Sequence, residues 1–142
     1  WIEAEIYDAV QADCVHLGIT DSWRIAQLAA AHNVLSVPHN WHSSLGTVCN
    51  SHFVAGVESG HMCEFFMYPN DMRYGLLQDP PRPRQGVLHV PQTPGLGAKL
   101  VKDAEEIFAP GEGPAVTANP DFPDAWDRAR ERERNVSARY SA

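Results

Sequence analysis

Apolar and polar residues follow two different periodicities along the first half of the chain. Residues 6–13, 34–38 and 62–67 are short and mostly apolar runs, as is typical of strands buried on both faces of a parallel sheet. Between these runs, over residues 22–32 and 45–57, apolar positions recur at the spacing of a helix. The pattern therefore predicts the order strand, helix, strand, helix, strand.

The predicted helices carry signals for an inner face and for their ends. Leu28 and Ala29 belong to the apolar stripe of the first helix, and Asn33 can end that helix in the left-handed conformation. Ser43 or Ser44 can cap the second helix. Helices that alternate with strands over short connections indicate an α/β fold with a parallel sheet and right-handed crossovers.

The character of the chain changes after the third apolar run. Proline-rich residues 79–84 predict an irregular crossing, residues 86–91 an edge strand, and residues 102–108 a short helix. The remainder is rich in proline, glycine and alanine and contains one charged helical stretch. We therefore divide the chain into residues 1–108, the βα part with its exit segment, and residues 109–142, an irregular tail with a short charged helix.

The composition fits a globular domain and excludes several classes of protein. Of 142 residues, 44% are hydrophobic and 20% are charged, and the formal net charge is -7. An acidic chain without a basic stripe argues against nucleic acid as a partner. No apolar run approaches the roughly 20 residues that span a bilayer, so we expect no membrane partner. Three cysteines without a C-x-x-C pair favour a reducing compartment, and we expect a cytoplasmic protein.

Three polar residues, Asp13, His39 and Glu64, stand at or near the ends of the three predicted strands. Because the carboxyl ends of parallel strands meet at one edge, we expect these side chains to face one cavity. A carboxylate beside an imidazole orients the ring, selects its tautomer and raises its pKa, which suits general acid–base catalysis. Glu64 stands among apolar residues, where a carboxyl group that stays protonated can hydrogen-bond a substrate oxygen.

The same residues also have simpler interpretations. A histidine at the end of a strand is often structural, and Asp13 alone can cap the turn that follows it. In the loop after His39, Trp41 and Asn40 are candidates for substrate binding, although a loop tryptophan packed on the next helix is an equal alternative. His39 and His42, three positions apart, are too small a set to predict a zinc site.

Seven short segments have an order and a spacing that are together typical of one enzyme family. They are residues 10–13 (VQAD), 17–20 (LGIT), 25–29 (IAQLA), 37–39 (VPH), 63–64 (CE), 86–91 (GVLHVP) and 94–97 (PGLG). They resemble the mandelate racemase and muconate lactonizing enzyme family of the enolase superfamily. The resemblance is to the C-terminal portion of that family's TIM-like (β/α) barrel, from about strand six to strand eight, and to the exit segment that packs on a capping domain.

The resemblance implies a reaction and roles for three residues. The family removes a proton next to a carboxylate, and Mg²⁺ stabilises the resulting enediolate. By this resemblance His39 is the acid–base, Asp13 is its dyad partner, and Glu64 supplies a hydrogen bond to the substrate carboxylate or enediolate. Racemases and acid-sugar dehydratases share this arrangement. We therefore expect a small hydroxy-carboxylate substrate, in the first place an acid sugar, and a full-length protein that is a homo-oligomer.

The resemblance also implies parts that this chain does not contain. The family's Mg²⁺ ligands lie on barrel strands three to five and its lysine base on strand two, so we assign no metal ligand here and expect the isolated chain to be inactive and prone to aggregation. Leu17 replaces one glycine of the family's turn, and the loop after Asp13 is one residue short. If that deletion lay before Asp13, Ala12 would take the dyad position, because a slip of one residue reverses the facing side of a strand.

Two interpretations from other classes stay open on the sequence alone. The chain could be a non-catalytic fragment whose βα units only bind or scaffold. It could also come from an unrelated TIM-barrel enzyme such as a metal-dependent hydrolase, because a fold does not fix a chemistry. Clustered upstream histidines would favour the hydrolase, whereas an upstream lysine base and three spaced acids would favour the first interpretation.

Overall fold

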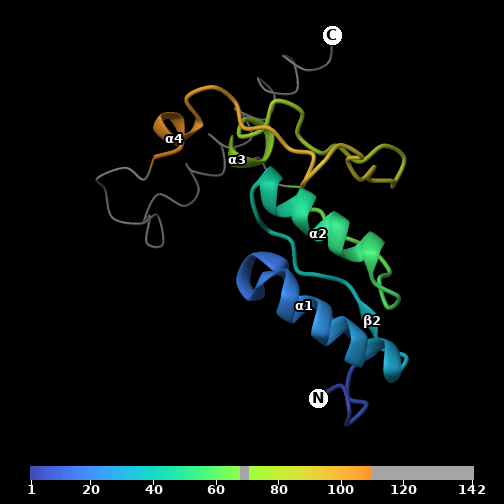
Figure 1. Cartoon of the computed structure of the whole chain (residues 1–142). Helices are drawn as coiled ribbons and strands as arrows, with labels where there is room; N and C mark the ends of the chain where they lie inside the picture. The colour runs from blue at the N-terminus through green and yellow to red at the C-terminus, as the bar shows by residue number, and fades with distance from the viewer. Residues whose placement is uncertain (68–70, 110–142) are drawn as a thin grey trace, which may run out of the picture.

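The computed structural model describes residues 1–67 and 71–109, and within them the chain follows the predicted order as far as the second helix. The elements are β1 (Ala9–Val10), α1 (Cys14–Ala31), β2 (Leu35–Ser36), α2 (Ser44–Gly56), α3 (Asp71–Tyr74) and α4 (Ala104–Ile107). Helices α1 and α2 lie side by side, and the chain between them passes through β2 (Figure 1). Helices α3 and α4 lie beyond the N-terminal end of α2 (Figure 1).

Three segments of the chain pair in parallel. Strand β1 pairs with β2, with Ala9 opposite Leu35 and Val10 opposite Ser36. A third segment joins Ser36 through a parallel bridge at Gly60. The α/β order and the parallel pairing predicted from the sequence are therefore confirmed, although each strand is much shorter than its apolar run.

The third predicted strand, over residues 62–67, is wrong: no ladder forms there in the described part of the chain. Its backbone groups bond side chains instead of a neighbouring strand. Asn40 Nδ2 donates to the carbonyl of Glu64 at 2.7 Å, and Arg73 donates to the carbonyl of Phe66. These bonds satisfy the polar backbone that a strand partner would otherwise satisfy.

Asp13 is the N-cap of helix α1, and its carboxylate accepts a hydrogen bond of 2.9 Å from the backbone N–H of Val15. Gly18, at φ 77° and ψ 160°, interrupts the helical geometry and separates the first turn from the rest of the helix. Further on, Ala29 is fully buried, whereas Leu28, which belongs to the same apolar stripe in the sequence, is 39% exposed. The inner face carries small side chains, which bring the helix close to the elements it packs on.

Helix α2 begins at Ser43, whose hydroxyl accepts from the backbone N–H of Gly46 at 3.5 Å. Its side chains Val48 and Phe53 are buried. Two small apolar clusters form the core between the helices and the strands. One contains Cys14, Ala26 and Phe53, and the other contains Ile2, Ala29 and Val34.

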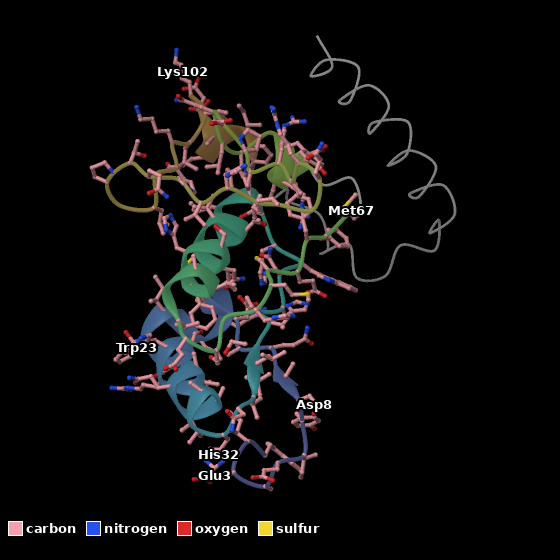
Figure 2. All side chains as sticks on the ribbon, turned by 90° about the vertical axis from the view of Figure 1, so that its right-hand side faces the viewer. Glu3, Asp8, Trp23, His32, Met67 and Lys102 are labelled. Carbon is pink, nitrogen blue, oxygen red and sulfur yellow. The ribbon has the colours of Figure 1, made fainter. Side chains whose placement is uncertain are left out.

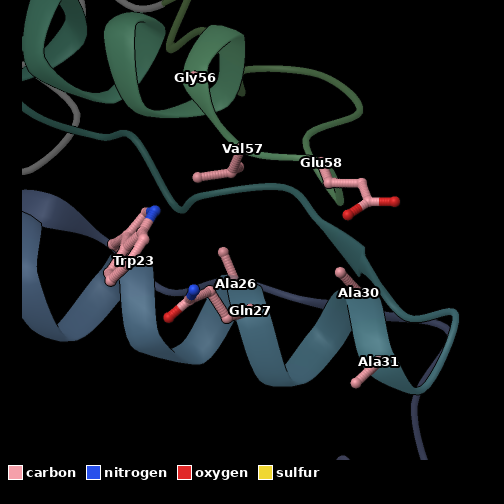
Figure 3. A pocket seen from close by; sticks show the side chains of 8 residues that line it. All are labelled: Trp23, Ala26, Gln27, Ala30, Ala31, Gly56, Val57 and Glu58. Carbon is pink, nitrogen blue, oxygen red and sulfur yellow. The ribbon is translucent and has the colours of Figure 1, made fainter.

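A surface groove of about 510 Å³ lies between the C-terminal half of α1 and the segment that follows α2 (Figure 3). It is lined by Trp23, Ala26, Gln27, Ala30, Ala31, Gly56, Val57 and Glu58. Trp23, at its rim, lies on the opposite side of the molecule from Asp8, the residue before β1 (Figure 2). None of the residues that line this groove is one of the predicted site residues Asp13, His39 and Glu64.

The segment after α3 is mostly irregular. The predicted edge strand over residues 86–91 is wrong: the chain makes only a single antiparallel bridge between Arg84 and Val87. Gln85 and Gly86 between them have φ of 53° and 79°, which turns the chain too sharply for a ladder. His52 on α2 fastens this segment through a contact of 3.0 Å between its Nε2 and the carbonyl of Leu96.

The last described element agrees with its prediction in place but not in length. Helix α4 covers four residues within the predicted range 102–108. The predicted tail, with its short charged helix, lies outside the described residues apart from its first position. Among the described residues, no helix is both long and apolar enough to cross a membrane.

Candidate active site

The candidate site lies where the three parallel segments end. Asp13 follows β1, His39 follows β2, and Glu64 follows the bridge at Gly60. The structure brings Asp13 and His39 together as predicted, with 3.5 Å between Asp13 Oδ2 and His39 Nδ1. The histidine side chain is 40% exposed and the aspartate is buried, so the pair has a protected carboxylate and an accessible imidazole.

The contacts of Asp13 keep it ionised. Burial by itself raises the pKa of this carboxyl, but hydrogen bonds from His42, Val15 and Asn50 outweigh it, so the pKa of Asp13 lies below its usual value. Oδ1 accepts from Val15 N at 2.9 Å and from Asn50 Nδ2 at 3.2 Å. The other oxygen, Oδ2, is thereby held toward the histidines.

Two further histidines share the Asp13 carboxylate, and the sequence analysis did not place either of them in the site. His42 Nε2 lies 2.5 Å from Asp13 Oδ2, closer than His39, and the His16 ring nitrogen lies at 3.7 Å. Each of them stands three positions after a predicted site residue. This spacing of three residues, which occurs at both Asp13 and His39, was the signal present in the sequence. It indicates a shared site only when the start of α1 and the loop after β2 are known to be in contact.

Trp41 lies at the open side of the site and is 58% exposed. Its ring stacks on Phe66 at 5.3 Å between centroids and lies 5.6 Å from the ring of His39. An exposed indole beside an accessible imidazole can form one wall of a substrate pocket. The position of Trp41 therefore suits the role predicted for it.

Asn40 and Glu64 are joined by two hydrogen bonds. The backbone N–H of Asn40 donates to Glu64 Oε2 at 2.9 Å, and its side-chain amide donates to the Glu64 carbonyl. Asn40 is fully buried, so its placement does not fit the substrate-binding role predicted from the sequence. In this structure both residues hold the backbone of the loop that carries His39.

Asn50, on α2, connects the two halves of the site. Its Oδ1 accepts from the backbone N–H of Cys14 at 3.0 Å. Its Nδ2 lies 3.2 Å from Asp13 Oδ1, 3.2 Å from the carbonyl of His39 and 3.3 Å from Asn40 Oδ1. A polar residue in the middle of a mostly apolar helix was the signal in the sequence for this connecting role. A buried amide needs hydrogen-bond partners, and Asn50 finds them in both halves of the site.

Arg73, on α3, holds the same loop from the other side and is also fully buried. Its Nη2 donates to the carbonyls of Asn40 and His42 at 3.4 and 3.3 Å. Its guanidinium also lies over the rings of Phe65 and Phe66, 4.7 and 5.0 Å from their centroids. The sequence analysis predicted neither α3 nor this contact.

The arrangement has the parts of a general acid–base: an ionised, buried carboxylate and an imidazole that it can orient. It does not have the parts of a magnesium site. Mg²⁺ prefers oxygen ligands, and the groups gathered around Asp13 are imidazoles. The groups around Asp13 thus do not fit Mg²⁺, and such an ion would have to be held by other residues.

Comparison with known proteins gives one family. The family model described as "Enolase C-terminal domain-like" matches residues 1–104. A D-galactarolactone cycloisomerase from Agrobacterium fabrum is 30% identical over 116 residues, which cover 75% of this chain and 31% of the relative. An L-rhamnonate dehydratase from Saccharopolyspora erythraea is 36% identical over 94 residues, which cover 62% of this chain and 23% of the relative.

A solved structure shows the same relation in three dimensions. A crystal structure from Bordetella bronchiseptica, described as a mandelate racemase, matches with a TM-score of 0.74 and 28% identity. The match covers 83% of this chain and 30% of the chain in that crystal structure. The chain therefore has the fold of part of the C-terminal (β/α)-barrel domain of these proteins, and it spans less than a third of their length.

Proposed function

The chain belongs to the enolase C-terminal domain-like family, and on that premise we propose that the whole protein is an enzyme that removes the proton next to the carboxylate of a hydroxy acid. We propose that it is an acid-sugar dehydratase or racemase. The observation that carries this proposal is the contact between Asp13 and His39 at the ends of neighbouring parallel segments. In barrel folds of this type the reactive groups gather at these ends.

Within this proposal His39 moves the proton and Asp13 holds His39. Asp13 faces Nδ1, which leaves Nε2 to face the substrate and fixes the tautomer that can accept a proton there. When the imidazole accepts the α-proton, the C–H electron pair stays on the substrate as the enolate. In a dehydration, the imidazolium can return a proton to the β-hydroxyl, which leaves as water while a C–C double bond forms.

His39, rather than His42, is the substrate-facing residue in this proposal, although His42 is nearer to Asp13. The side chain of His42 is 15% exposed and that of His39 is 40% exposed. His39 also lies against the exposed Trp41 ring, which would line the pocket. His42 then acts through Asp13, whose carboxylate it helps to keep ionised.

We propose that the whole protein uses Mg²⁺, held by residues outside this chain, to stabilise negative charge on the substrate. A related structure from Burkholderia xenovorans, 29% identical with a TM-score of 0.66 over 72% of this chain, is described as bound to magnesium and fumarate. The substrate class is taken from the relatives, whose names refer to sugar acids and their lactones. A homo-oligomeric, cytoplasmic protein is part of the same proposal.

The test is His39→Asn in the whole protein, assayed against a panel of sugar acids, with His61→Asn as the matched control. His61 is exposed and lies outside the cluster around Asp13. We expect His39→Asn to lower turnover by about 10²–10⁴-fold, the usual contribution of a general acid–base. The control variant should keep wild-type turnover, and far-UV circular dichroism should show that both variants are folded.

Two outcomes would contradict the proposal. Near-wild-type turnover in His39→Asn would remove His39 from the chemistry. Absence of activity in the wild type on every sugar acid, together with retained ligand binding, would favour the non-catalytic alternative. The family match already favours the proposed chemistry over that of an unrelated metal-dependent hydrolase.

A further inference from the structure

The histidines around Asp13 form a larger group than a dyad needs. Asp13, His16, His39 and His42 each offer one ligand atom, and these atoms all lie within 4.8 Å of one another. Two of the residues come from the start of α1 and two from the loop after β2. We propose that these four residues bind a divalent transition-metal ion, with Zn²⁺ as the representative ion.

Two of the three distances from Asp13 Oδ2 to the imidazole nitrogens are close to those around a tetrahedral ion, and all four ligand atoms lie within 4.8 Å of one another. Bonds of about 2.0–2.1 Å from zinc to nitrogen and oxygen place neighbouring ligand atoms about 3.3 Å apart. His39 Nδ1 lies 3.5 Å and His16 Nε2 lies 3.7 Å from Asp13 Oδ2. His42 Nε2 lies at 2.5 Å, and an ion bound by both atoms would place it about 1 Å further out.

The carboxylate is already oriented for such an ion. Asp13 Oδ1 is occupied by hydrogen bonds from Val15 N and Asn50 Nδ2, so Oδ2 is the oxygen presented to the three imidazoles. Outer contacts of this kind fix ligands in place and raise metal affinity. One ligand, the Asp13 carboxylate, is buried, and another, the His16 side chain, is 69% exposed. The ion would therefore be partly shielded from solvent but still able to enter from it.

The donor set selects the kind of ion. Three imidazole nitrogens and one carboxylate oxygen suit zinc and its neighbours such as cobalt, nickel and copper, whereas Mg²⁺ prefers oxygen. Gly18 helps the site to adjust, because its positive φ separates the turn that carries His16 from the rest of α1. His16 can therefore approach an ion without displacing the packed part of the helix.

An ion in this site has a consequence for the proposed chemistry. It would occupy Asp13 Oδ2 and His39 Nδ1, the two atoms through which the carboxylate orients the acid–base. Binding should therefore inhibit proton transfer by His39. This inhibitory consequence rests on the proposed function, whereas the binding itself does not.

The binding test is a Zn²⁺ titration of the whole protein in excess Mg²⁺ by equilibrium dialysis, with Co²⁺ as an optical probe of coordination. We expect one ion per chain and the visible absorption of tetrahedral Co²⁺. His16→Gln and His42→Gln should each weaken binding at least tenfold, whereas His61→Gln, the matched control, should leave it unchanged. Absence of binding, or equal affinity in all these variants, would overturn the site. Circular dichroism of each variant excludes loss of the fold as the cause.

The inhibition test uses the whole protein and compares each variant with its own zinc-free turnover. Zinc should inhibit the wild type, and the concentration needed for half inhibition should rise at least tenfold in His16→Gln. Zinc binding at the cluster without inhibition would overturn the dyad of the proposed function and leave the metal site standing. Inhibition with the same zinc dependence in His16→Gln would overturn the metal site as its cause.

Discussion

The two ends of α1 differ in what their side chains do. At the first turn, Asp13 and His16 meet polar groups of the loop after β2 through hydrogen bonds and charged contacts. In the second half, Ala26 and Ala29 are buried in small apolar clusters between the strands and α2. One helix thus carries the candidate chemistry at one end and close packing at the other.

This difference follows the general division of barrel folds. The C-terminal ends of the barrel strands, with the loops that follow them, carry activity, whereas the N-terminal ends contribute to stability. In this chain the separation is sharpened by Gly18, whose conformation divides the first turn from the packed part of the helix. Substitutions at the two ends should therefore affect different measurements.

The largest expected effect is that of Asp13→Asn on turnover. Asparagine still caps a helix, but it removes the negative charge that orients and supports the imidazoles. We expect turnover of the whole protein to fall by about 10²-fold or more. The free energy of unfolding in urea should fall by about 1 kcal/mol, because the hydrogen bond between His42 and the carboxylate is lost. A variant that loses stability in proportion to its activity would show that the polar end is structural.

The second effect is that of Ala29→Leu on stability. A leucine at this fully buried position has to displace its neighbours, and overpacking of this kind costs about 1–3 kcal/mol. Turnover per folded molecule should stay at the wild-type value. The matched control is Ala55→Leu, at an exposed position of α2, which should unfold at the wild-type urea concentration. Equal midpoints for the two variants would contradict the packing assigned to Ala29.

A smaller effect is expected at the start of α2. Ser43→Ala removes the hydroxyl that accepts from Gly46 N and should lower the free energy of unfolding by about 1 kcal/mol. Ser43→Gly should cost only a few tenths of a kcal/mol, because glycine is itself tolerated as a cap. Urea denaturation of the two variants measures the difference, and the same loss in both would argue against the cap.

The smallest effect is on the order in which the thiols are alkylated, which requires no change in packing. A hydrogen bond from Cys14 lowers the pKa of Cys49, while burial raises the pKa of Cys63 to about 11. The thiolate is the reactive form, so Cys49 should be alkylated first as pH rises through neutrality, and Cys63 only in strong alkali. Mass spectrometry of iodoacetamide-treated protein measures the order, and faster labelling of Cys63 would contradict it.

The features that could be predicted from the sequence are the local ones. The order of strands and helices, the cap at Ser43 and the left-handed Asn33, at φ 57°, depend on nearby residues. The meeting of Asp13 with His39 could also be predicted, because parallel strands end at a common edge.

The features that could not be predicted depend on contacts between distant segments. The apolar run at residues 62–67 forms no strand because Asn40 and Arg73 take its carbonyls. His42 lies nearer than His39 to Asp13 because of the conformation of one loop, which periodicity does not describe. Leu28 is exposed because α1 turns its smaller residues inward to let the neighbouring elements approach.

The contacts of Arg73 have a consequence for how the site can diverge between proteins. Its hydrogen bonds to the loop after β2 are to main-chain carbonyls, which every amino acid supplies. Exchange of an outward-facing residue of that loop, such as Trp41, leaves these bonds in place. Because the guanidinium is also shielded from dissolved ions, its hold should vary little with ionic strength. Ligand preference can thus evolve at Trp41, while the path of the loop is held by these main-chain bonds and by the buried side chain of Asn40.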